Sequence, residues 1–352
     1  MIHKVFVGLS GGVDSAVSAA LLKEQGLNVA GVFIKIWQPE FIECTWREDR
    51  LDAMRVCAAL DIPFHEIDLS EEYKKEVVDT MVRDYGKGLT PNPDVLCNRV
   101  VKFGAFAAWA RKEGAAAIAT GHYAQKEEVA GHTNLMRARD AAKDQSYFLY
   151  MLGQTDLNRA LFPIGGLLKS EVRKEALRLN LPVARKPDSQ GLCFIGEVSM
   201  RDFLARFLPV TPGPVRTREG KLLGEHEGAA LYTVGQRHGF LTGGSSVPHY
   251  VVDVDVTKNT VYVSPRREDA ARESVLLEHI SWVSRESAEW KGLRAQARYH
   301  EEPVGVRIEK QDAHYLVKFE TPHIASPGQS LVLYDGDVCL GGGIIGKSAV
   351  HK

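Results

Sequence analysis

The sequence predicts an α/β protein in which an N-terminal doubly wound parallel sheet is followed by a small, mainly β central domain and a C-terminal β-barrel. Strand-like and helix-like segments alternate through residues 1–120, which is typical of a parallel sheet covered on both faces. After about residue 200, short strand-like segments separated by turn residues dominate. The chain has 352 residues, more than one hydrophobic core usually serves, so several domains are expected.

The first strand–turn–helix unit is the most informative part of the sequence. The apolar run Val5-Phe6-Val7 precedes the turn GLSGGVDS, residues 8–15, and a helix-like segment follows it. Gly11 and Gly12 allow backbone angles closed to other residues, so successive N–H groups can converge on phosphate oxygens at the helix N-terminus. The turn lacks the lysine of G-x-x-x-x-G-K-[ST] and does not match G-x-G-x-x-G. It is therefore expected to be an anion-binding loop of another class.

The next elements complete the predicted sheet. Further strands are expected at 28–36, 63–69 and 115–120, and helices at about 47–60, at 70–85 with Ser70 as the cap, and at 100–113. A basic helix is expected at about 169–181. Open α/β sheets bind ligands at the carboxyl ends of their strands, so the glycine-rich loop marks the expected site.

The remaining elements are mostly strands. Ser199 and Asp202 form a capping-box pattern for a short helix ending near residue 207, and the proline-rich residues 209–214 mark a boundary. A hairpin is expected at 250–256 and 260–264, and barrel strands at 305–308, 314–319, 330–334 and 338–345. The expected domains are 1–205, 206–273 and 274–352.

Charge and cysteine content narrow the classes of function. Residues 1–96 carry ten Lys/Arg against sixteen Asp/Glu, whereas residues 165–218 carry ten against five, which suits an anionic macromolecule as well as it suits a solvated charged face. No run of 18 apolar residues occurs and the first strand begins at once, so we expect a cytoplasmic protein without a membrane segment. The five cysteines show neither C-x-x-C nor zinc spacing, so no metal site is predicted. An iron–sulfur cluster is not predicted either, and one ligated partly by Cys97 and Cys193 stays an open alternative.

Two cysteines lie in segments marked by proline and glycine. Cys97 ends the stretch TPNPDVLC just before a predicted helix, where the helix dipole favours the thiolate form, and Asp94 or Asn98 could cap that helix. Cys193 lies in DSQGLCFIG, residues 188–196. Neither follows the apolar periodicity of a buried thiol, whereas Cys44, Cys57 and Cys339 are interpreted as structural.

These motifs together resemble those of bacterial tRNA-specific 2-thiouridylases, which belong to the ATP pyrophosphatases with an adenine nucleotide α-hydrolase-like domain. The resemblance rests on SGGVDS, TPNPDVLCN, ATGHYA, KDQSYFL at 143–149 and DSQGLCFIG, and it continues through LYTVGQR at 231–237 and the Ala297-Arg298-Tyr299 tripeptide to the C-terminus. It implies ATP-dependent 2-thiolation of the wobble uridine of tRNA. ATP with Mg²⁺ would adenylate O2 of the base and release pyrophosphate, and sulfur would then replace the AMP.

The resemblance also implies roles for individual residues. Cys97 would be the nucleophile and Cys193 the persulfide carrier, supplied by a persulfide-donating protein or a cysteine desulfurase, and a transient Cys97–Cys193 disulfide would close the reaction. Asp94 is a candidate acid/base, with helix capping as the alternative. The implied ATP contacts are Gly8, Leu9, Ser10, Gly11, Gly12, Val13, Asp14, Ser15, Ile34 and Gly121. The implied tRNA contacts are Asn92, Pro93, Asp94, Lys143, Asp144, Gln145, Arg298 and Tyr299.

Three alternatives accompany this interpretation. His122 could serve as an acid/base, although a hydrogen-bonded structural histidine is the favoured interpretation. An ATP pyrophosphatase that amidates or ligates a small molecule would share the loop but would not need both cysteines. A non-catalytic RNA binder that senses nucleotide would bind ATP without releasing pyrophosphate.

Overall fold

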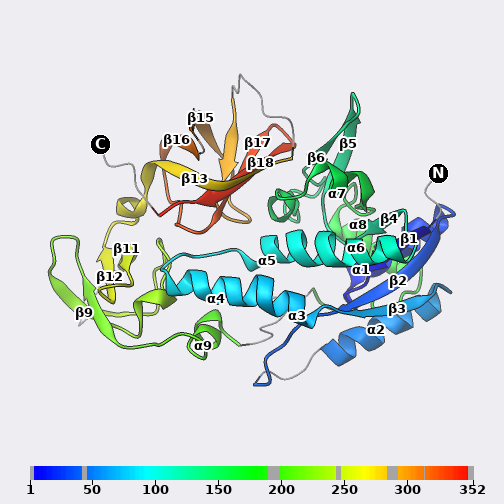
Figure 1. The fold of residues 1–352 in the computed structure, drawn as a ribbon, viewed down its shortest axis with the longest axis horizontal. Helices are drawn as coiled ribbons and strands as arrows, with labels where there is room; N and C mark the ends of the chain where they lie inside the picture. Colours follow the sequence, from blue (N-terminus) through cyan, green and yellow to red (C-terminus); the bar gives the residue numbers. More distant parts are fainter. Residues whose placement is uncertain are drawn as a thin grey trace.

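The computed structural model describes residues 4–41, 46–188, 198–242, 247–283, 292–312 and 314–347. These residues form three sheets (Figure 1). Cys193 and Cys44 lie outside the described residues. Among the described residues, none forms a helix long and apolar enough to cross a membrane.

The N-terminal sheet is parallel throughout, as predicted. Its five strands lie in the order β3-β2-β1-β4-β7. Their bounds are β1 Lys4–Gly8, β2 Asn28–Lys35, β3 Phe64–Asp68, β4 Ala117–Ala119 and β7 Ala160–Leu161. The helices between and after them are α1 Val13–Glu24, α2 Trp46–Ala59, α3 Ser70–Tyr73, η1 Lys74–Val78, α4 Asp79–Gly86, α5 Pro93–Leu96, η2 Cys97–Phe106, α6 Ala107–Lys112, η3 Ser146–Leu149, α7 Gln154–Arg159 and α8 Lys169–Arg178.

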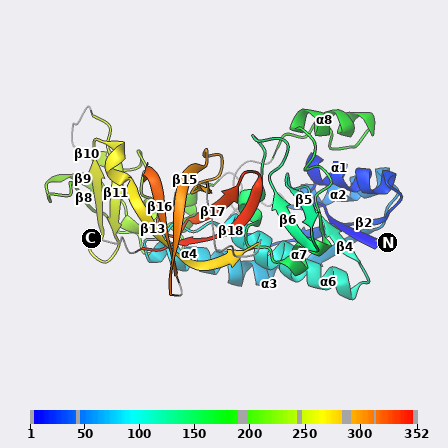
Figure 2. The same ribbon diagram turned by 90° about the horizontal axis from the view of Figure 1, so that it is seen from above.

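Two hydrophobic cores cover the two faces of this sheet, because side chains alternate along β1. Val5 and Val7 join the core that includes residues of α1, α2 and α8. Phe6 joins the core that includes residues of η1, α4, η2 and α6. Figure 2 shows α1 and α8 on one side of the sheet and α6 on the other. The doubly wound prediction is therefore confirmed.

The helix that carries Cys97 begins earlier than predicted. Helical residues run without a break from Pro93 to Lys112, and the middle of this helix, Cys97–Phe106, is π-helical. Neither Asp94 nor Asn98 is its cap, because the Asn92 side chain accepts hydrogen bonds from the N–H groups of Asp94 and Val95. Proline is well suited to the first helical position, so the helix starts four residues before Cys97.

A similar difference occurs at the predicted cap Ser70. Ser70 is the first helical residue, and its N–H donates to the carboxylate of Asp68. The Asp68 carboxylate therefore accepts a hydrogen bond at the start of this helix, where a serine hydroxyl was expected to do so.

The central region holds a five-stranded sheet in the order β10-β9-β8-β12-β11. Its strands are β8 Gly213–Arg216, β9 Leu222–His226, β10 Leu241–Thr242, β11 Tyr250–Asp255 and β12 Thr260–Ser264, with short helices η4 Ala229–Leu231 and η5 Arg267–Ala270. The predicted hairpin is β11–β12. The helix before this region, α9 Met200–Leu204, is capped by Ser199 as predicted, because its hydroxyl accepts the N–H of Asp202 at 3.1 Å.

The C-terminal region closes into a barrel, because β13 pairs with both β16 and β18. The barrel strands are β13 Arg272–Trp282, β14 Arg294–Gln296, β15 Val304–Gln311, β16 His314–His323, β17 Ser330–Asp335 and β18 Val338–Ile345. The N-terminal region adds a hairpin, β5 Gln125–Val129 and β6 His132–Met136, to this sheet, which no pattern in the sequence predicted. Leu135 of β6 pairs with Cys339 of β18, so the barrel is joined to the N-terminal region by strand pairing.

Candidate active site

The glycine-rich loop joins β1 to α1 at the carboxyl edge of the parallel sheet. Gly11 has φ +72°, and a Cβ atom there would lie 2.8 Å from the Cα of Asp49, so only glycine fits. Gly12 stands at the helix N-cap in an extended conformation and has no side chain with which to cap it. The N–H groups of the first turn are therefore available to an anion in front of the loop.

Two further predicted ATP contacts meet the loop. Gly121 follows β4, and a Cβ atom there would lie 2.7 Å from the backbone nitrogen of Ser15, so this turn packs directly on the start of α1. Ile34 ends near Gly8, since its Cδ1 lies 3.7 Å from the position of a Cβ at Gly8. The carboxyl ends of β1, β2 and β4 thus bring together the residues that the resemblance assigned to the nucleotide.

A chain of charged groups surrounds the loop. Asp14 accepts hydrogen bonds from the Tyr123 hydroxyl at 2.9 Å and from Lys169 Nζ at 2.6 Å. Lys169 also pairs with Asp188 at 2.9 Å. Burial and the Asp14 carboxylate raise the pKa of Tyr123, so its hydroxyl stays protonated and donates.

Asp188 gathers three cations at the end of the described segment that leads toward Cys193. Lys143 lies 3.0 Å from its carboxylate, and Arg173 lies 2.5 Å away on the side next to Lys169. Although burial acts to raise it, hydrogen bonds from Lys169 and Lys143 hold the pKa of Asp188 at about 2. This cation cluster, Lys143, Lys169 and Arg173, suits the neutralisation of phosphate. The sequence showed the basic helix and Lys143 but not their convergence, which is tertiary.

Lys186 anchors the same segment to α2. Its ammonium pairs with Asp49 at 2.8 Å and with Asp52 at 2.7 Å. Asp49 is also the residue against which Gly11 packs. Residues 186–188 are therefore linked to the loop twice, through Asp49 and through the Lys169 bridge between Asp188 and Asp14. The position of Cys193 itself, and of the proposed Cys97–Cys193 pair, lies outside the described residues.

Cys97 and Asp94 lie near the start of the π-containing helix. Cys97 is the fifth residue of this helix and therefore lies past its first turn. The sequence interpretation set Cys97 apart from buried thiols, and this is wrong, because the residue is only 7% exposed. Burial raises the pKa of Asp94, against the opposing charge of Lys102. A carboxyl group with a raised pKa can hold or give up a proton closer to neutral pH, which is what an acid/base needs.

Aromatic residues of two regions meet beside this helix. The ring of Tyr299, from the barrel region, lies 4.5 Å from that of Phe148, whose carbonyl accepts a hydrogen bond from Asn98 Nδ2 at 3.2 Å. Burial and then the carboxylates of Asp144, Asp140 and Asp94 raise the pKa of Tyr299 to about 12. Tyr299 therefore lies within electrostatic range of Asp94, and the barrel region contributes to this end of the site.

The other predicted tRNA contacts are held by the protein itself. Asp144 is buried and accepts hydrogen bonds from the N–H groups of Ala138 and Ser146. Gln145 accepts the N–H of Tyr123 at 3.0 Å. Arg298 donates to the carbonyl of Val234 at 2.8 Å and joins the barrel to the central region. In this structure these three side chains organise loops, and their contact with tRNA stays a prediction.

His122 has the structural environment that the sequence interpretation favoured. Burial and the charge of Lys102 lower its pKa well below the usual value, so the imidazole is neutral. Thr120 Oγ1 lies 2.7 Å from its Nδ1. The buried thiols Cys57 and Cys339 have pKa values raised by burial to about 11 and about 12, which makes both inert. No group of three or more potential ligands among the described residues could hold a metal ion.

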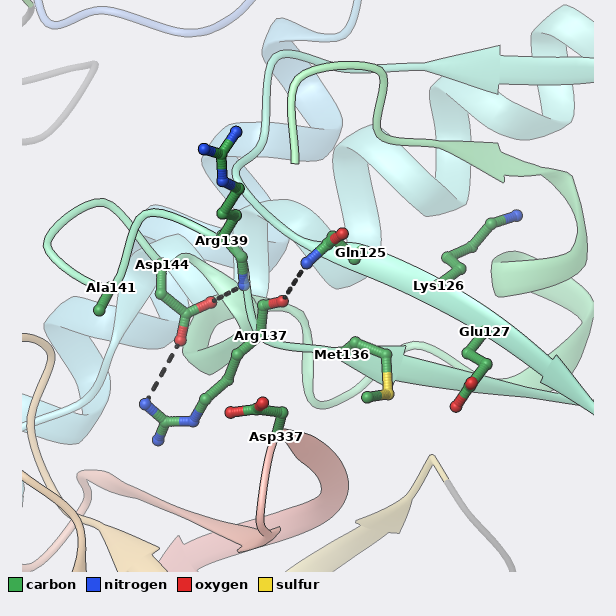
Figure 3. Close-up of a pocket in the computed structure, with 10 residues that line it drawn as sticks. Gln125, Lys126, Glu127, Met136, Arg137, Arg139, Ala141, Asp144 and Asp337 are labelled. Atoms are coloured by element: carbon green, nitrogen blue, oxygen red, sulfur yellow. Dashed lines mark hydrogen bonds and ion pairs between the residues drawn. The ribbon is translucent and has the colours of Figure 1, made fainter. Parts of the chain in front are cut away.

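A groove of about 700 Å³ is lined by Asp144 but not by the candidate catalytic or ATP-binding residues (Figure 3). It lies where the β5–β6 hairpin meets the turn between β17 and β18, and Arg137, Asp144 and Asp337 are among its lining residues. Arg137 stacks on Tyr334 at 3.9 Å and lies 3.7 Å from Asp144. Neither the glycine-rich loop nor Cys97 lines it.

Comparison with protein families divides the chain into three consecutive matches. Residues 3–197 match the tRNA methyl transferase HUP domain, and residues 201–265 match the tRNA methyl transferase PRC-barrel domain. Residues 272–345 match the aminomethyltransferase beta-barrel domain. The three matches follow the three regions described above.

Curated relatives match over nearly the whole chain. The tRNA-specific 2-thiouridylase MnmA of Ralstonia nicotianae is 45% identical, over 98% of this chain and 96% of its own length. The protein of the same name from Aeromonas salmonicida is 43% identical, over 99% of this chain and 98% of its own length.

Solved structures are more distantly similar. The U34-tRNA thiolase NcsA from Methanococcus maripaludis, determined with its [4Fe-4S] cluster, has a TM-score of 0.36 and 23% identity, covering 59% of this chain and 67% of its own. NMN synthetase from Francisella tularensis has a TM-score of 0.35 and 20% identity, covering 59% and 78%. Both TM-scores lie below 0.5, so nothing about this chain follows from them.

Proposed function

The chain belongs to the tRNA-specific 2-thiouridylase family, and from this premise we propose that it uses ATP to replace O2 of the wobble uridine of tRNA with sulfur. The observation that carries the proposal is that one chain combines a tightly packed glycine-rich turn at the carboxyl edge of the sheet with a buried cysteine, Cys97, and matches these relatives over nearly its whole length.

The loop and its surroundings would bind the nucleotide. Gly11 and Gly121 let the turn pack tightly against Asp49 and Ser15, which would leave the N–H groups of the first helical turn facing the β- and γ-phosphates, and the cation cluster of Lys143, Lys169 and Arg173 would offer positive charge. Mg²⁺ would enter with ATP, because this ion is usually held by one or two carboxylates together with substrate phosphates, and Asp14 is the carboxylate at the loop. Its chemistry would be to neutralise charge on the leaving pyrophosphate.

Activation of the base would precede sulfur transfer. Attack of the uridine O2 on the α-phosphorus releases pyrophosphate and leaves AMP on O2, which is a far better leaving group than oxide. The base must leave the anticodon stack to reach the loop. Asn92, Pro93 and Asp94 at the start of the helix, with Tyr299 in contact with the tilted ring of Phe148, would receive it there.

The sulfur step would use both cysteines. The terminal sulfur of a Cys193 persulfide attacks C2 and AMP leaves with the C–O electron pair. The Cys97 thiolate then attacks the Sγ of Cys193, so the S–S bond breaks, its electrons stay on the sulfur bound to C2, and 2-thiouridine leaves. A Cys97–Cys193 disulfide remains, which an external thiol must reduce before the next turnover. Asp94 would move the proton released during activation.

Two partners and a compartment complete the proposal. The persulfide would come from a persulfide-donating protein or a cysteine desulfurase, because the mechanism consumes one sulfane sulfur per turnover. A catalytic disulfide that must be reduced again suits the reducing cytoplasm, where tRNA is also found.

The decisive test is mass analysis of nucleosides from tRNA that lacks the wobble thiolation, after incubation with the protein, Mg-ATP and a persulfide source. Formation of 2-thiouridine by the wild type but not by Asp14→Ala would support the proposal. Pyrophosphate release without a thionucleoside would favour a different acceptor. A methylated nucleoside would contradict the proposal and agree instead with the wording of the family descriptions.

A further inference from the structure

Lys102 has no role in the proposed function, and it lies on the helix between Cys97 and the glycine-rich loop. Lys102 is half-buried on η2, five residues after Cys97. In a π-helical segment, hydrogen bonds join residues five apart, so Lys102 follows Cys97 by one turn. The same segment continues to Phe106, whose ring lies 3.6 Å from the position of a Cβ at Gly8. Lys102 therefore stands on the path from the cysteine to the glycine-rich loop.

Among the described residues, none supplies a counterion to Lys102 within 4 Å. Its Nζ lies 3.4 Å from Nε2 of His122, a neutral imidazole. A lysine ammonium only donates, so Nε2 accepts, and the ring proton must reside on Nδ1 and be donated to Thr120 Oγ1 at 2.7 Å. The carboxyl group of Asp94 senses the charge of Lys102 but, within the part of the chain that the structure describes, forms no ion pair with it.

The turn that holds His122 also touches the nucleotide loop. Gly121 packs against the backbone nitrogen of Ser15, and the next residue, His122, holds the ammonium, so one turn contacts both the start of α1 and Lys102. A partly desolvated ammonium without a carboxylate partner raises the free energy of the folded protein, and a bound anion would offset that cost. The loop and the cluster of Lys143, Lys169 and Arg173 would serve the β- and γ-phosphates. The nucleotide group that lies on the cysteine side is the α-phosphate, since it is the phosphate attacked by the base.

We propose that Lys102 and the Gly121–His122 turn form a site for the α-phosphate of the nucleotide, and hence for AMP as it leaves the base. The proposal rests on the proposed function. His122 is then a positioning residue, because it orients the ammonium through Nε2 and touches no reacting atom. The site would divide the nucleotide between two sets of cations, one for pyrophosphate and one for AMP.

The test compares binding of AMP with binding of pyrophosphate by calorimetry in the absence of tRNA. Lys102→Met should weaken AMP binding roughly 10- to 100-fold, the range for a lost charge-assisted hydrogen bond, and leave pyrophosphate binding within about twofold. Lys102→Arg should restore most of the AMP affinity. The matched control is Lys112→Met, at the exposed end of the same helix. Ser10→Ala, in the loop, should show the reverse preference and lose pyrophosphate.

Two outcomes would overturn the proposal. The first is unchanged AMP affinity in Lys102→Met with a normal thermal unfolding midpoint. The second is unchanged AMP affinity with slower alkylation of Cys97 at neutral pH, which would assign the ammonium to the thiolate instead. Because AMP binding needs neither tRNA nor sulfur, either result leaves thiolation of tRNA to be judged by its own assay.

Discussion

The two ends of the candidate site are built in different ways. The phosphate end is made from one continuous turn, Gly8–Ser15, with Gly121 packed on it, and its shape comes from backbone. The base end is made from side chains of three distant segments, represented by Cys97, Phe148 and Tyr299. A local motif can specify the first, whereas only the tertiary fold assembles the second. Substitutions at the phosphate end should therefore impair activation of the base, whereas substitutions at the base end should impair sulfur transfer.

The largest separation is expected at Cys97. Cys97→Ser should lower 2-thiouridine formation by roughly three orders of magnitude or more, because a hydroxyl cannot replace a thiolate as the attacking group. Release of pyrophosphate on addition of tRNA should stay within a few-fold of the wild type, since the phosphate end is intact. Both products are measured in one reaction.

Cys57→Ala is the matched control for that experiment. Cys57 is buried, and burial raises the pKa of its thiol to about 11, so it has no thiolate to contribute. Its loss should spare thiolation. If Cys97→Ser also stopped pyrophosphate release, the division of the site into two independent ends would be wrong.

The next largest effect is expected at Gly11. Gly11→Ala must place a side chain at φ +72° and against the backbone of Asp49, and we expect ATP affinity to fall roughly 10- to 100-fold, the equivalent of about 1–3 kcal/mol of local strain. Gly26→Ala is the control, because Gly26 has a similar φ of +79° but nothing within 4 Å of its Cβ position. Equal ATP affinities for the two variants would show that the loop does not need its tight packing on α2.

The contrast between the two ends explains what the sequence could predict. Alternating patterns and the GLSGGVDS turn predicted the parallel sheet and the phosphate end, because both depend on neighbours along the chain. The strand pairing of Leu135 with Cys339, and the contact of Tyr299 with Phe148, join segments some 150 residues apart or more, and no local pattern records them.

The start of the Cys97 helix shows the limit of local rules as well. The sequence interpretation placed the proline-containing stretch before the helix, yet Pro93 is the first helical residue because Asn92 caps it. The convergence of Lys169, Arg173 and Lys143 on Asp188 was also not predicted, since each belongs to a different segment or turn.

A smaller effect is expected where these cations meet the loop. Lys169→Met removes the partner of both Asp14 and Asp188, and we expect pyrophosphate release to fall about tenfold or more, because a charge-assisted contact is lost at the leaving group. Arg178→Met lies at the exposed end of the same helix and serves as the control. Binding of tRNA, measured by filter retention, should not change in either variant. Normal pyrophosphate release by Lys169→Met would show that this lysine does not act on the leaving pyrophosphate.

The smallest effect concerns His122, which lies between the two ends. Its pKa in the folded protein is well below the value of about 6.5 in an unfolded chain, because burial and Lys102 disfavour the charged ring. The unfolded state therefore binds more protons below pH 6.5, so the stabilisation is complete above that pH and is lost as the pH falls, by at most about 1.4 kcal/mol for each pH unit. Burial raises the pKa of Asp94 and of Asp144, and these groups act with the opposite sign.

A comparison of variants removes the contribution of those carboxyl groups. Between pH 7.5 and 5.5 the thermal unfolding midpoint of the wild type should fall by about 3–5 °C more than that of His122→Gln, given about 2–4 °C for each kcal/mol in a domain of this size. The exposed His238→Gln variant should follow the wild type. If His122→Gln kept the full wild-type pH dependence, the imidazole would not be the neutral link through which the Gly121 turn and the Cys97 helix are held together.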